Sequence, residues 1–449
     1  MPAVNWHALS LAEVSGRLGS GSLTSVALTQ HMLARIEQLN PTLNAFLTVT
    51  RDVALAAAEA ADRDRSRGRY LGPLHGIPVA IKDNIAMAGI RMTCGSRLYA
   101  DHIPERDADV VRRLRDTGAV ILGKLGMHEL AYGTTSDNPF FGTILNPRDH
   151  TLDAGGSSGG SASAVAGQLA FAAVGTDTAC SIRFPAHCCG IAGFKPSFGA
   201  ISTQGVVPLV RSLDHVGTLT RTAEDASLAF AAITGVSSPT ALPVADKDRL
   251  ENLRVGVVRR FFFDGDAEIR ATIEESLQRL QRRGAELVEL DFAGIDESVE
   301  ITGRLFREAY EEFAHDLSAR NNCFSASARE KFTRKSRISV ADYENAKRRH
   351  SAFSGKMDAL MQQCDVLLAP AATIMPARLG QWHDDYDLHA SKNATVFNLA
   401  GQPSITIPVQ SSSGGQPVGL MINGRRGCDL EMLNMTMLIE RQLNDPPAA

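Results

Sequence analysis

Ala154-Gly-Gly-Ser-Ser-Gly-Gly-Ser-Ala162 is the stretch around which the chain is organised. A Gly/Ser run of this kind is often a flexible linker, but a linker is usually flanked by a shift in composition. Here an Ala-rich helical pattern begins within the run and continues to Gly167, and an apolar strand pattern follows at Leu169–Gly175. The pattern therefore predicts a tight loop that opens a helix, with backbone N–H groups facing whatever lies in front of it.

A lysine stands at the end of an apolar run on the N-terminal side of this loop. The run Gly76-Ile-Pro-Val-Ala-Ile-Lys-Asp-Asn84 is typical of a buried strand, and it ends abruptly at Lys82. Such a strand places a charged group at the edge of a sheet. Lys124 also follows an apolar strand pattern (Ala119–Leu122), so the pattern alone assigns a catalytic role to neither lysine.

Strand and helix patterns alternate along the rest of the chain. Arg254–Val258, Asp266–Arg283 and Glu286–Leu290 form a strand–helix–strand unit. The helix of this unit carries one apolar stripe, made by Ile269, Ile273, Leu277 and Leu280. No repeat or low-complexity linker divides the chain. The alternation therefore predicts an α/β fold with a large, mostly buried sheet.

Two further expectations concern local structure. Thr24 to Leu39 has the pattern of a helix that Thr24 caps and Asn40-Pro41 ends. Gly193–Ser197 and Val206–Arg221, in contrast, have the composition of turn-rich connections.

Composition excludes several classes of function. Of the 449 residues, 44% are hydrophobic and 21% are charged, which is typical of a globular protein. The formal net charge of −4 gives no excess of positive charge that would indicate binding of nucleic acid. No apolar run is long enough to cross a membrane. The seven cysteines are scattered, with no Cys-x-x-Cys and no His-Glu-x-x-His, so we expect a reduced cytoplasmic protein without a zinc site. His187-Cys188-Cys189 is more typical of buried packing than of a metal pair.

Three interpretations of the Gly/Ser run compete. A phosphate-binding P-loop requires a lysine after the glycines, and none follows. Gly156-Ser-Ser-Gly-Gly160 matches Gly-x-Ser-x-Gly, which would make Ser158 a hydrolase nucleophile, but that motif must follow a buried strand and here a polar stretch precedes it. The third interpretation pairs a serine with a lysine base. Because Ser-x-x-Lys does not occur in the chain, the base must come from elsewhere in the fold, and Lys82 is the candidate.

The sequence resembles the amidase signature family at three ordered blocks. They are Gly76–Asn84, Gly155-Gly-Ser-Ser-Gly-Gly-Ser-Ala162 and Gly175-Thr-Asp-Thr-x-x-Ser-Ile-Arg183, and the spacing between Ser157 and Ser181 also fits. The similarity extends to shorter segments at Asn138–Gly142, Gly193–Gly199, Ser212–Gly217, Asn398–Pro403 and Pro417–Leu420. It therefore covers nearly the whole chain.

The resemblance implies a fold and a catalytic apparatus. The fold would be one large domain over residues 1–449, a mixed central sheet covered by helices on both faces, with a catalytic core at about 70–220. Ser181 would be the nucleophile, Ser157 a bridging serine on a cis peptide bond, and Lys82 the general base. Asp177 and Arg183 would fix the nucleophile loop, and Ser158 would hydrogen-bond within the same network. No metal or organic cofactor is implied.

The resemblance places the oxyanion hole in the backbone N–H groups of Thr178, Ala179, Cys180 and Ser181. The family usually has Gly-Gly where Ala179-Cys180 stand here, and a positive φ at either position would be strained in this chain. We hypothesise that Cys180 narrows or repolarises the acyl side of the pocket. Cys180 as the nucleophile is an alternative, since thiolates attack carbonyls well, but no histidine stands at an obvious base position.

Family members line the substrate channel with the segment that corresponds to Ala131, Tyr132 and Gly133. An aromatic such as Tyr132 is as readily a core residue as a substrate contact.

The predicted function is hydrolysis of a small-molecule amide by a serine acyl-enzyme mechanism, in a protein that contacts neither nucleic acid nor membrane and is a candidate homodimer. Three alternatives stay open. One is the A subunit of a tRNA-dependent amidotransferase, which releases ammonia from glutamine for a partner. A second is a ureide-cleaving enzyme such as a carboxybiuret hydrolase, which this chain resembles in length and in Asp214-His215. The third is a non-catalytic binding subunit that kept the fold.

Overall fold

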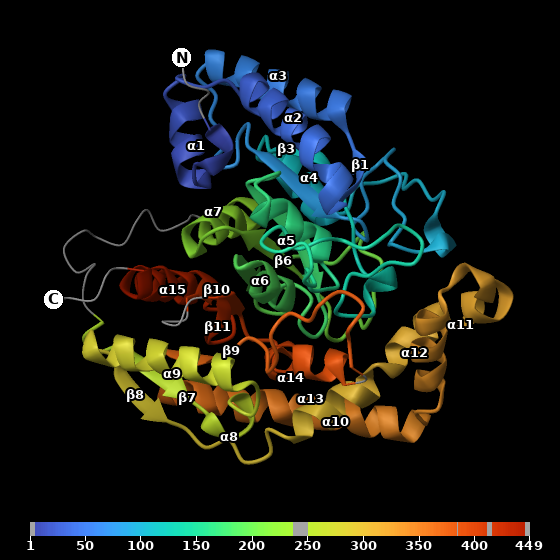
Figure 1. The fold of residues 1–449 in the computed structure, drawn as a ribbon, viewed down its shortest axis with the longest axis vertical. Coiled ribbons are helices and arrows are strands. Elements are labelled where there is room, and N and C mark those ends of the chain that lie inside the picture. Colours follow the sequence, from blue (N-terminus) through green and yellow to red (C-terminus); the bar gives the residue numbers. More distant parts are fainter. Residues whose placement is uncertain (1–4, 237–249, 384, 411–414, 445–449) are drawn as a thin grey trace.

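One eleven-stranded sheet runs through the computed structural model, which describes residues 5–236, 250–383, 385–410 and 415–444. Its strand order is β1-β3-β2-β4-β6-β5-β10-β11-β9-β7-β8 (Figure 1). The strands are β1 Phe46–Val49, β2 Pro78–Lys82, β3 Val120–Leu125, β4 Ala172–Asp177, β5 Ala192–Lys195, β6 His215–Thr220, β7 Arg254–Val257, β8 Glu286–Glu289, β9 Val366–Pro370, β10 Ser404–Val409 and β11 Val418–Asn423.

The sheet is mixed. Strand β2 is parallel to its neighbours β3 and β4, and β7 is parallel to its neighbours β8 and β9. The remaining pairs are antiparallel. The carboxyl ends of β2 and β4 therefore meet at one edge, where side chains from the two strands can come together.

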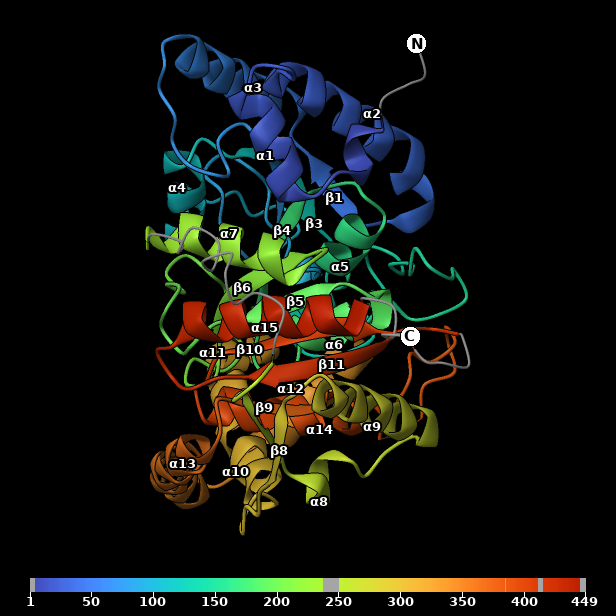
Figure 2. The same ribbon diagram turned by 90° about the vertical axis from the view of Figure 1, so that its left-hand side faces the viewer.

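Helices cover both faces of the sheet. Figure 2 shows α7, α15 and α9 in front of the strands, while α5 and α6 pack on the other face against β4, β5, β10 and β11. The α-helices are α1 Leu11–Gly19, α2 Ser25–Leu43, α3 Arg51–Ser66, α4 Asp109–Asp116, α5 Gly159–Ala166, α6 Arg183–Cys189, α7 Ala223–Thr234, α8 Arg259–Phe262, α9 Ala267–Arg282, α10 Glu297–Leu305, α11 Arg307–Ala319, α12 Ala326–Ser336, α13 Val340–Leu360, α14 Tyr386–Leu399 and α15 Asp429–Asn444. The predicted α/β class, with a mixed sheet between helices, is confirmed. No helix in the described ranges combines the length and the apolarity needed to span a bilayer.

The strand–helix–strand unit expected in the second half of the chain is confirmed as β7, α9 and β8. All four residues of its apolar stripe are buried: Ile269, Ile273, Leu277 and Leu280. The stripe therefore belongs to the core.

The predicted end of the first long helix is wrong. α2 begins after its cap Thr24, as expected, but continues through Pro41 to Leu43. Asn44 ends it in the left-handed conformation, with φ of 52°, and its N–H donates to the carbonyl of Asn40 at 2.8 Å. Proline in the last turn removes only one helical hydrogen bond, so that the tertiary contacts of the helix prevail.

Two segments expected to be turn-rich connections contain central strands instead. β5 (Ala192–Lys195) and β6 (His215–Thr220) pair with each other, and β6 also pairs with β4. Their patterns mislead because polar residues such as Thr218 are buried along with the apolar ones. Position in the middle of the sheet, rather than local propensity, makes these residues strands.

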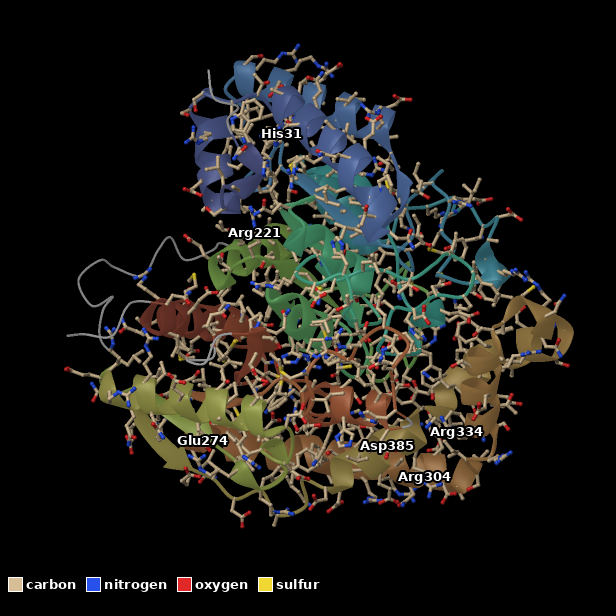
Figure 3. The ribbon with its side chains drawn as sticks, in the orientation of Figure 1. His31, Arg221, Glu274, Arg304, Arg334 and Asp385 are labelled. Atoms are coloured by element: carbon tan, nitrogen blue, oxygen red, sulfur yellow. The ribbon has the colours of Figure 1, made fainter. Side chains whose placement is uncertain are left out.

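Arg221 fastens the N-terminal segment to the sheet. It follows β6, and its Nη1 donates to the carbonyl of His7 at 2.6 Å while Nη2 donates to that of Leu9. Figure 3 shows Arg221 between the N-terminal helices and α7, with His31 farther out. His31 in turn contacts His7, with 2.8 Å between Nε2 and Nδ1.

Candidate active site

The Gly/Ser run forms a buried turn in front of α5, so the rejection of a flexible linker is confirmed. Residues Ala154 to Val165 are all buried, and the Gly156–Ser157 peptide bond is cis, as the resemblance implies. A Cβ on Gly160 would lie 2.4 Å from the carbonyl oxygen of Gly126, a separation that no side chain tolerates. The glycines therefore let this turn press against the loop that follows β3.

Lys82 reaches this turn from the carboxyl end of β2. It is fully buried, and its Nζ donates to Ser157 Oγ and to Thr176 Oγ1, both at 2.8 Å. Burial lowers the pKa of Lys82 from 10.5 to about 7, against the opposing attraction of Asp177 and Asp214. At neutral pH much of this lysine is thus unprotonated, and its nitrogen can accept a proton.

Ser181 lies on the loop between β4 and α6, next to the Gly/Ser turn. Its carbonyl accepts a hydrogen bond from the backbone N–H of Ser158 at 3.2 Å, which ties the two segments together. Its side chain is largely buried, with 6% of the residue exposed. Within the described part of the chain the Ser181 hydroxyl has no hydrogen-bond partner. The structure thus brings the Lys82, Ser157 and Ser181 segments together at one edge of the sheet.

The backbone of the same loop offers unused donors. The N–H groups of Ala179, Cys180 and Ser181 donate to no other group of the described residues. The next one along, that of Ile182, is taken up by the Asp177 carboxylate at 2.9 Å. Free, fixed N–H groups close to a nucleophile are what stabilisation of an oxyanion requires.

Ala179 and Cys180 occupy their unusual positions without backbone strain. Neither is among the non-glycine residues of positive φ, so the conditional expectation of strain does not apply. Cys180 is buried, and burial together with the nearby Asp177 raises the pKa of its thiol well above the ordinary value. A thiol that stays protonated is a poor nucleophile, which argues against the Cys180 alternative.

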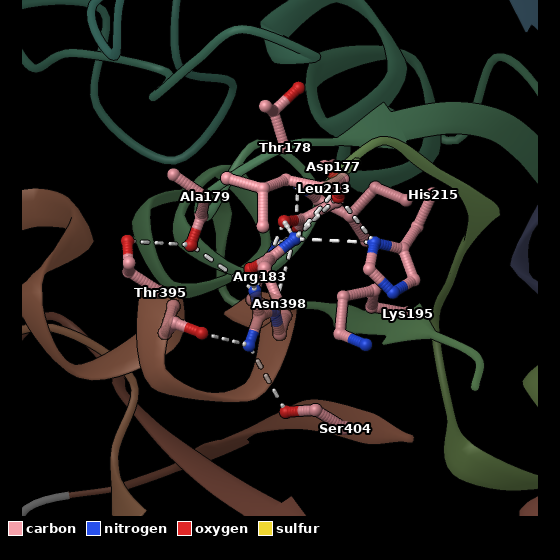
Figure 4. A network of polar contacts seen from close by, with 12 residues as sticks. Asp177, Thr178, Ala179, Arg183, Lys195, Leu213, His215, Thr395, Asn398 and Ser404 are labelled. Carbon is pink, nitrogen blue, oxygen red and sulfur yellow. Dashed lines mark hydrogen bonds and ion pairs between the residues drawn. The ribbon is translucent and has the colours of Figure 1, made fainter. Parts of the chain in front are cut away.

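A buried ion pair fixes the nucleophile loop (Figure 4). Arg183 and Asp177 are both fully buried, with 3.0 Å between Nη2 and Oδ1. Burial raises the pKa of Asp177, but the guanidinium and further hydrogen bonds outweigh it and hold this pKa below its usual range. Asn398 of α14 donates to the Asp177 carboxylate at 2.9 Å and accepts from Arg183. Through these two hydrogen bonds α14 helps to hold the nucleophile loop in place. Arg183 also donates to the carbonyl of Ala179 at 3.2 Å.

Ser158 has a different environment from that of Ser181. Its hydroxyl is buried and donates to the carbonyl of Thr176 at 3.1 Å. The turn that carries it follows a polar loop rather than a strand, as the sequence indicates. A supporting role in the network fits these contacts better than the role of nucleophile.

A cavity of about 240 Å³ lies beside Thr176 and Thr178. Ala131, one of three residues expected to line a substrate channel, lies in its wall, and Cys180 is not among the residues that line it. Ala131 is held with a positive φ of 61°.

The other two expected channel residues pack elsewhere. The ring of Tyr132 lies against those of Phe306 and Phe332, with centroids 5.2 and 5.1 Å apart, as a core aromatic would. Gly133 lies against the imidazole of His128, where a Cβ would come within 2.2 Å of Nε2.

Sequence reasoning missed Thr176, Asn84 and Asn398 as parts of the site. Thr176 shares the Lys82 amine with Ser157, and Asn84 donates to Thr176 Oγ1 at 3.2 Å. Thr176 and Asn84 stand inside the quoted blocks, so a closer look at polar residues on the two parallel strands could have found them. Asn398 begins the quoted segment Asn398–Pro403, but it lies 215 positions after Arg183, and no local pattern links the two.

No group of three or more histidine, cysteine, aspartate or glutamate side chains in the described ranges is arranged to hold a metal ion. His187 instead accepts from the backbone N–H of Gly419 at 2.7 Å, and the neighbouring Cys188 and Cys189 are buried, which agrees with the packing role expected for these residues.

Known proteins resemble this chain along nearly all of its length. The sequence model of the family described as Amidase matches residues 27–433. The A subunit of the glutamyl-tRNA(Gln) amidotransferase of Halorhodospira halophila is 36% identical over 466 residues, which cover 96% of each chain. The crystal structure of an amidase has a TM-score of 0.89 at 32% identity and covers 97% of this chain and 100% of its own. The peptide amidase of Stenotrophomonas maltophilia has a TM-score of 0.82 at 28% identity, with 99% of both chains covered.

Proposed function

Since this chain belongs to the amidase family, we propose that it cleaves a carboxamide C–N bond through an acyl-enzyme on Ser181. The observation that carries the proposal is Lys82, a fully buried lysine whose pKa burial lowers to about 7 and whose amine lies 2.8 Å from Ser157 Oγ. A serine hydroxyl attacks a carbonyl only if a base removes its proton. Lys82 has both the position and the lowered pKa that such a base requires.

The proton would travel along two serines. As the Ser181 oxygen attacks the carbonyl carbon, its proton moves to Ser157 and that of Ser157 moves to the lone pair of Lys82. When the tetrahedral intermediate collapses, Lys82 returns a proton through Ser157 to the leaving nitrogen, which departs as an amine. Water then attacks the acyl-enzyme with the same pair as base, and Ser181 is released. Thr176 accepts a hydrogen bond from the lysine and so helps to orient it.

The negative charge that develops on the carbonyl oxygen needs fixed donors. The predicted hole is the backbone of Thr178, Ala179, Cys180 and Ser181, and the unused N–H groups of the last three support it. Loss of one such donor typically lowers kcat by about 10²–10³-fold. Asp177, Arg183 and Ser158 serve to hold this loop in position.

Labelling with a fluorophosphonate tests the assignment of the nucleophile. Intact mass is measured for the wild type, Ser181→Ala and Ser158→Ala. We expect an adduct on the wild type and on Ser158→Ala, and none on Ser181→Ala. Loss of the adduct in Ser158→Ala alone would instead favour the Gly-x-Ser-x-Gly interpretation. The absence of an adduct on every form would favour a non-catalytic subunit.

A second candidate function is release of ammonia from glutamine within an amidotransferase. The relative from Halorhodospira halophila, which is named as one component of such an enzyme, favours it. The same catalytic residues would serve both functions, so the test is ammonia release by the purified chain. Turnover of simple amides by the chain alone supports the amidase, whereas glutamine turnover only with added partner subunits supports the amidotransferase. A ureide-cleaving enzyme would use the same steps on a different carbonyl.

A further inference from the structure

Asp153 is a buried carboxyl group that the proposed proton transfer does not use. It lies at the end of the polar loop in front of the Gly/Ser turn, and it has no exposed surface. Its Oδ1 accepts from the backbone N–H of Gly155 at 2.9 Å, and its Oδ2 accepts from the hydroxyl of Tyr386 at 3.1 Å. Burial raises the pKa of Asp153 well above its ordinary value, against these hydrogen bonds. Since burial of a carboxyl group beside uncharged partners costs stability, such a group is a candidate for a functional role.

Tyr386 connects Asp153 to helix α14. It is the first residue of that helix, and it is buried. Its hydroxyl oxygen accepts from the backbone N–H of Ala377 at 3.2 Å, and its own hydrogen is donated to Asp153. The backbone N–H of Asp153 in turn donates to the carbonyl of Ala377 at 2.8 Å. Asp153, Ala377 and Tyr386 therefore hold one another through a closed set of three hydrogen bonds.

Asp153 acts on the Gly/Ser turn through Gly155. The φ of Gly155 is 72°, and a Cβ there would lie 2.7 Å from Cα of Pro185 in α6. The glycine thus lies directly against α6, and the hydrogen bond from its N–H to Asp153 fixes the start of the turn. Ser157 follows two residues later, and its Oγ lies 2.8 Å from Lys82 Nζ. Proton transfer between these two atoms requires that this distance be kept.

The second residue of α14 contacts the turn by another route. Asp387 accepts from the N–H and from the hydroxyl of Thr134, at 3.1 and 2.6 Å. A Cβ on Gly156 would lie 2.9 Å from the carbonyl carbon of Thr134, so the loop that Asp387 holds is in direct contact with the turn. The last turn of α14 holds the nucleophile loop through Asn398. One helix therefore contacts the supports of both serines of the proposed site.

We propose that Asp153 is a positioning residue which, held by α14, keeps the Gly/Ser turn where Ser157 can pass a proton between Ser181 and Lys82. The inference rests on the proposed amidohydrolase function and adds to it a residue that touches no reacting atom. The proton passes through Ser157 in both directions. A small displacement of the turn therefore weakens both the deprotonation of Ser181 and the return of a proton to the leaving nitrogen.

The test compares an amide with an ester of the same acyl group, N-(4-nitrophenyl)butanamide and 4-nitrophenyl butanoate. Nitrophenolate departs as a stable anion, whereas the amide nitrogen must first receive a proton. We expect Asp153→Ala to lower kcat/KM about 10²-fold for the amide and only about tenfold for the ester. Because the readout is a ratio of two substrates, a smaller fraction of folded protein does not imitate the result.

Two further variants and a matched control separate positioning from a loss of stability. Asp153→Asn keeps an oxygen for the N–H of Gly155 and should retain most of the amide activity. Tyr386→Phe removes the hydroxyl from Asp153 and should change the ratio in the same direction as Asp153→Ala, but less. The control is Asp225→Ala, because Asp225 is also a fully buried carboxyl group that accepts a backbone N–H, that of Leu11 at 3.0 Å, but it lies on α7. It should lose stability without a change in the ratio.

The rate of fluorophosphonate labelling provides a readout that requires neither substrate. Asp153→Ala keeps Ser181, so it should still form the adduct, about tenfold more slowly than the wild type, and Asp153→Asn should react at nearly the wild-type rate. Should Asp153→Ala fail to fold, Tyr386→Phe carries the same test.

Either an unchanged ratio or an unchanged labelling rate in Asp153→Ala would overturn the inference while leaving the amidohydrolase intact. An Asp153→Asn variant as impaired as Asp153→Ala would overturn it as well. Failure of the amidohydrolase itself appears differently, as the absence of both turnover and adduct in the wild type.

Discussion

Lys82 is the last residue of β2 and Lys124 the last but one of the neighbouring parallel strand β3; both are fully buried, and their surroundings are opposite. The amine of Lys82 meets the hydroxyls of Ser157 and Thr176, which carry no charge. The amine of Lys124 lies 3.3 Å from the Asp83 carboxylate and donates to the carbonyl of Ile85 at 2.6 Å. Burial alone therefore does not make a general base, and the partner of the buried amine decides its role.

The contacts of Lys124 also hold the backbone next to Lys82. Asp83 directly follows Lys82, and its carboxylate accepts from the N–H of Thr93 at 2.8 Å as well as pairing with Lys124. Burial lowers the pKa of Lys124 and raises that of Asp83, and their mutual attraction opposes both shifts. Lys195, a third fully buried lysine at a strand end, donates only to the carbonyls of Pro196 and Gln402 among the described residues. The three buried lysines thus differ in the partner of the amine, which is a carboxylate for Lys124, hydroxyl groups for Lys82 and only carbonyl groups for Lys195.

Lys82→Met should produce the largest effect. Removal of the proposed general base is expected to lower kcat by about 10³–10⁴-fold, toward the upper end of what general acid–base catalysis contributes. Steady-state ammonia release measures it, and circular dichroism verifies the fold. A loss of less than tenfold would mean that another group takes the proton.

Lys124→Met should be the most destabilising change of the series. Removal of one partner of a buried ion pair leaves Asp83 uncompensated and costs about 3–5 kcal/mol of the free energy of unfolding. Urea denaturation measures this loss, and the double variant Lys124→Met/Asp83→Asn should recover part of it. Unchanged stability in the single variant would show that Asp83 does not depend on Lys124.

The pH dependence of activity follows from Lys82. Its pKa of about 7 means that the neutral, base-competent form is lost as the pH falls below that value. kcat/KM should therefore rise about tenfold per pH unit up to pH 7 and level off above it. The pH–rate profile of the wild type measures this, and a profile that is flat from pH 5 to 8 would contradict the role of Lys82.

Stability should depend on pH through Lys82, and Lys82→Met should differ from Lys124→Met in the sign of its stability change at pH 7. Between about pH 7 and the ordinary lysine value of 10.5, the unfolded chain holds a proton on residue 82 that the folded chain does not. The free energy of unfolding should therefore rise with pH in this window through Lys82. Relative to the wild type, Lys82→Met should lose that rise and be more stable at pH 7, whereas Lys124→Met is less stable. Denaturation at pH 7 and pH 9 checks both signs.

Lys195→Met should have the smallest effect. The change removes two hydrogen bonds to carbonyls but leaves no carboxylate unpaired, so the expected cost is about 1–2 kcal/mol. Urea denaturation beside Lys124→Met compares the two directly. A loss as large as that of Lys124→Met would show that burial, and not the charge of the partner, sets the cost.

The sequence was sufficient for the fold class and for the local composition of the site. Alternating strand and helix patterns predicted the α/β class, and the resemblance of three blocks to the amidase signature family brought Lys82, Ser157 and Ser181 forward as candidates. These features are local, because the pattern of adjacent residues determines a strand or a Gly-rich turn. For the same reason the segments of β5 and β6 were wrongly predicted to be turn-rich connections. Their composition is polar, and they form strands because they pair in the middle of the sheet.

Only the tertiary structure shows why Lys82 rather than Lys124 has the surroundings of a base, and what holds the nucleophile loop. Lys82 and Lys124 follow similar apolar patterns, and they differ only in partners that come from other strands and turns. Asn398, which braces Asp177 and Arg183, lies far outside the predicted core at about 70–220. Burial, the pKa shifts that it causes and contacts between distant segments depend on the packed fold, and no stretch of sequence contains them by itself.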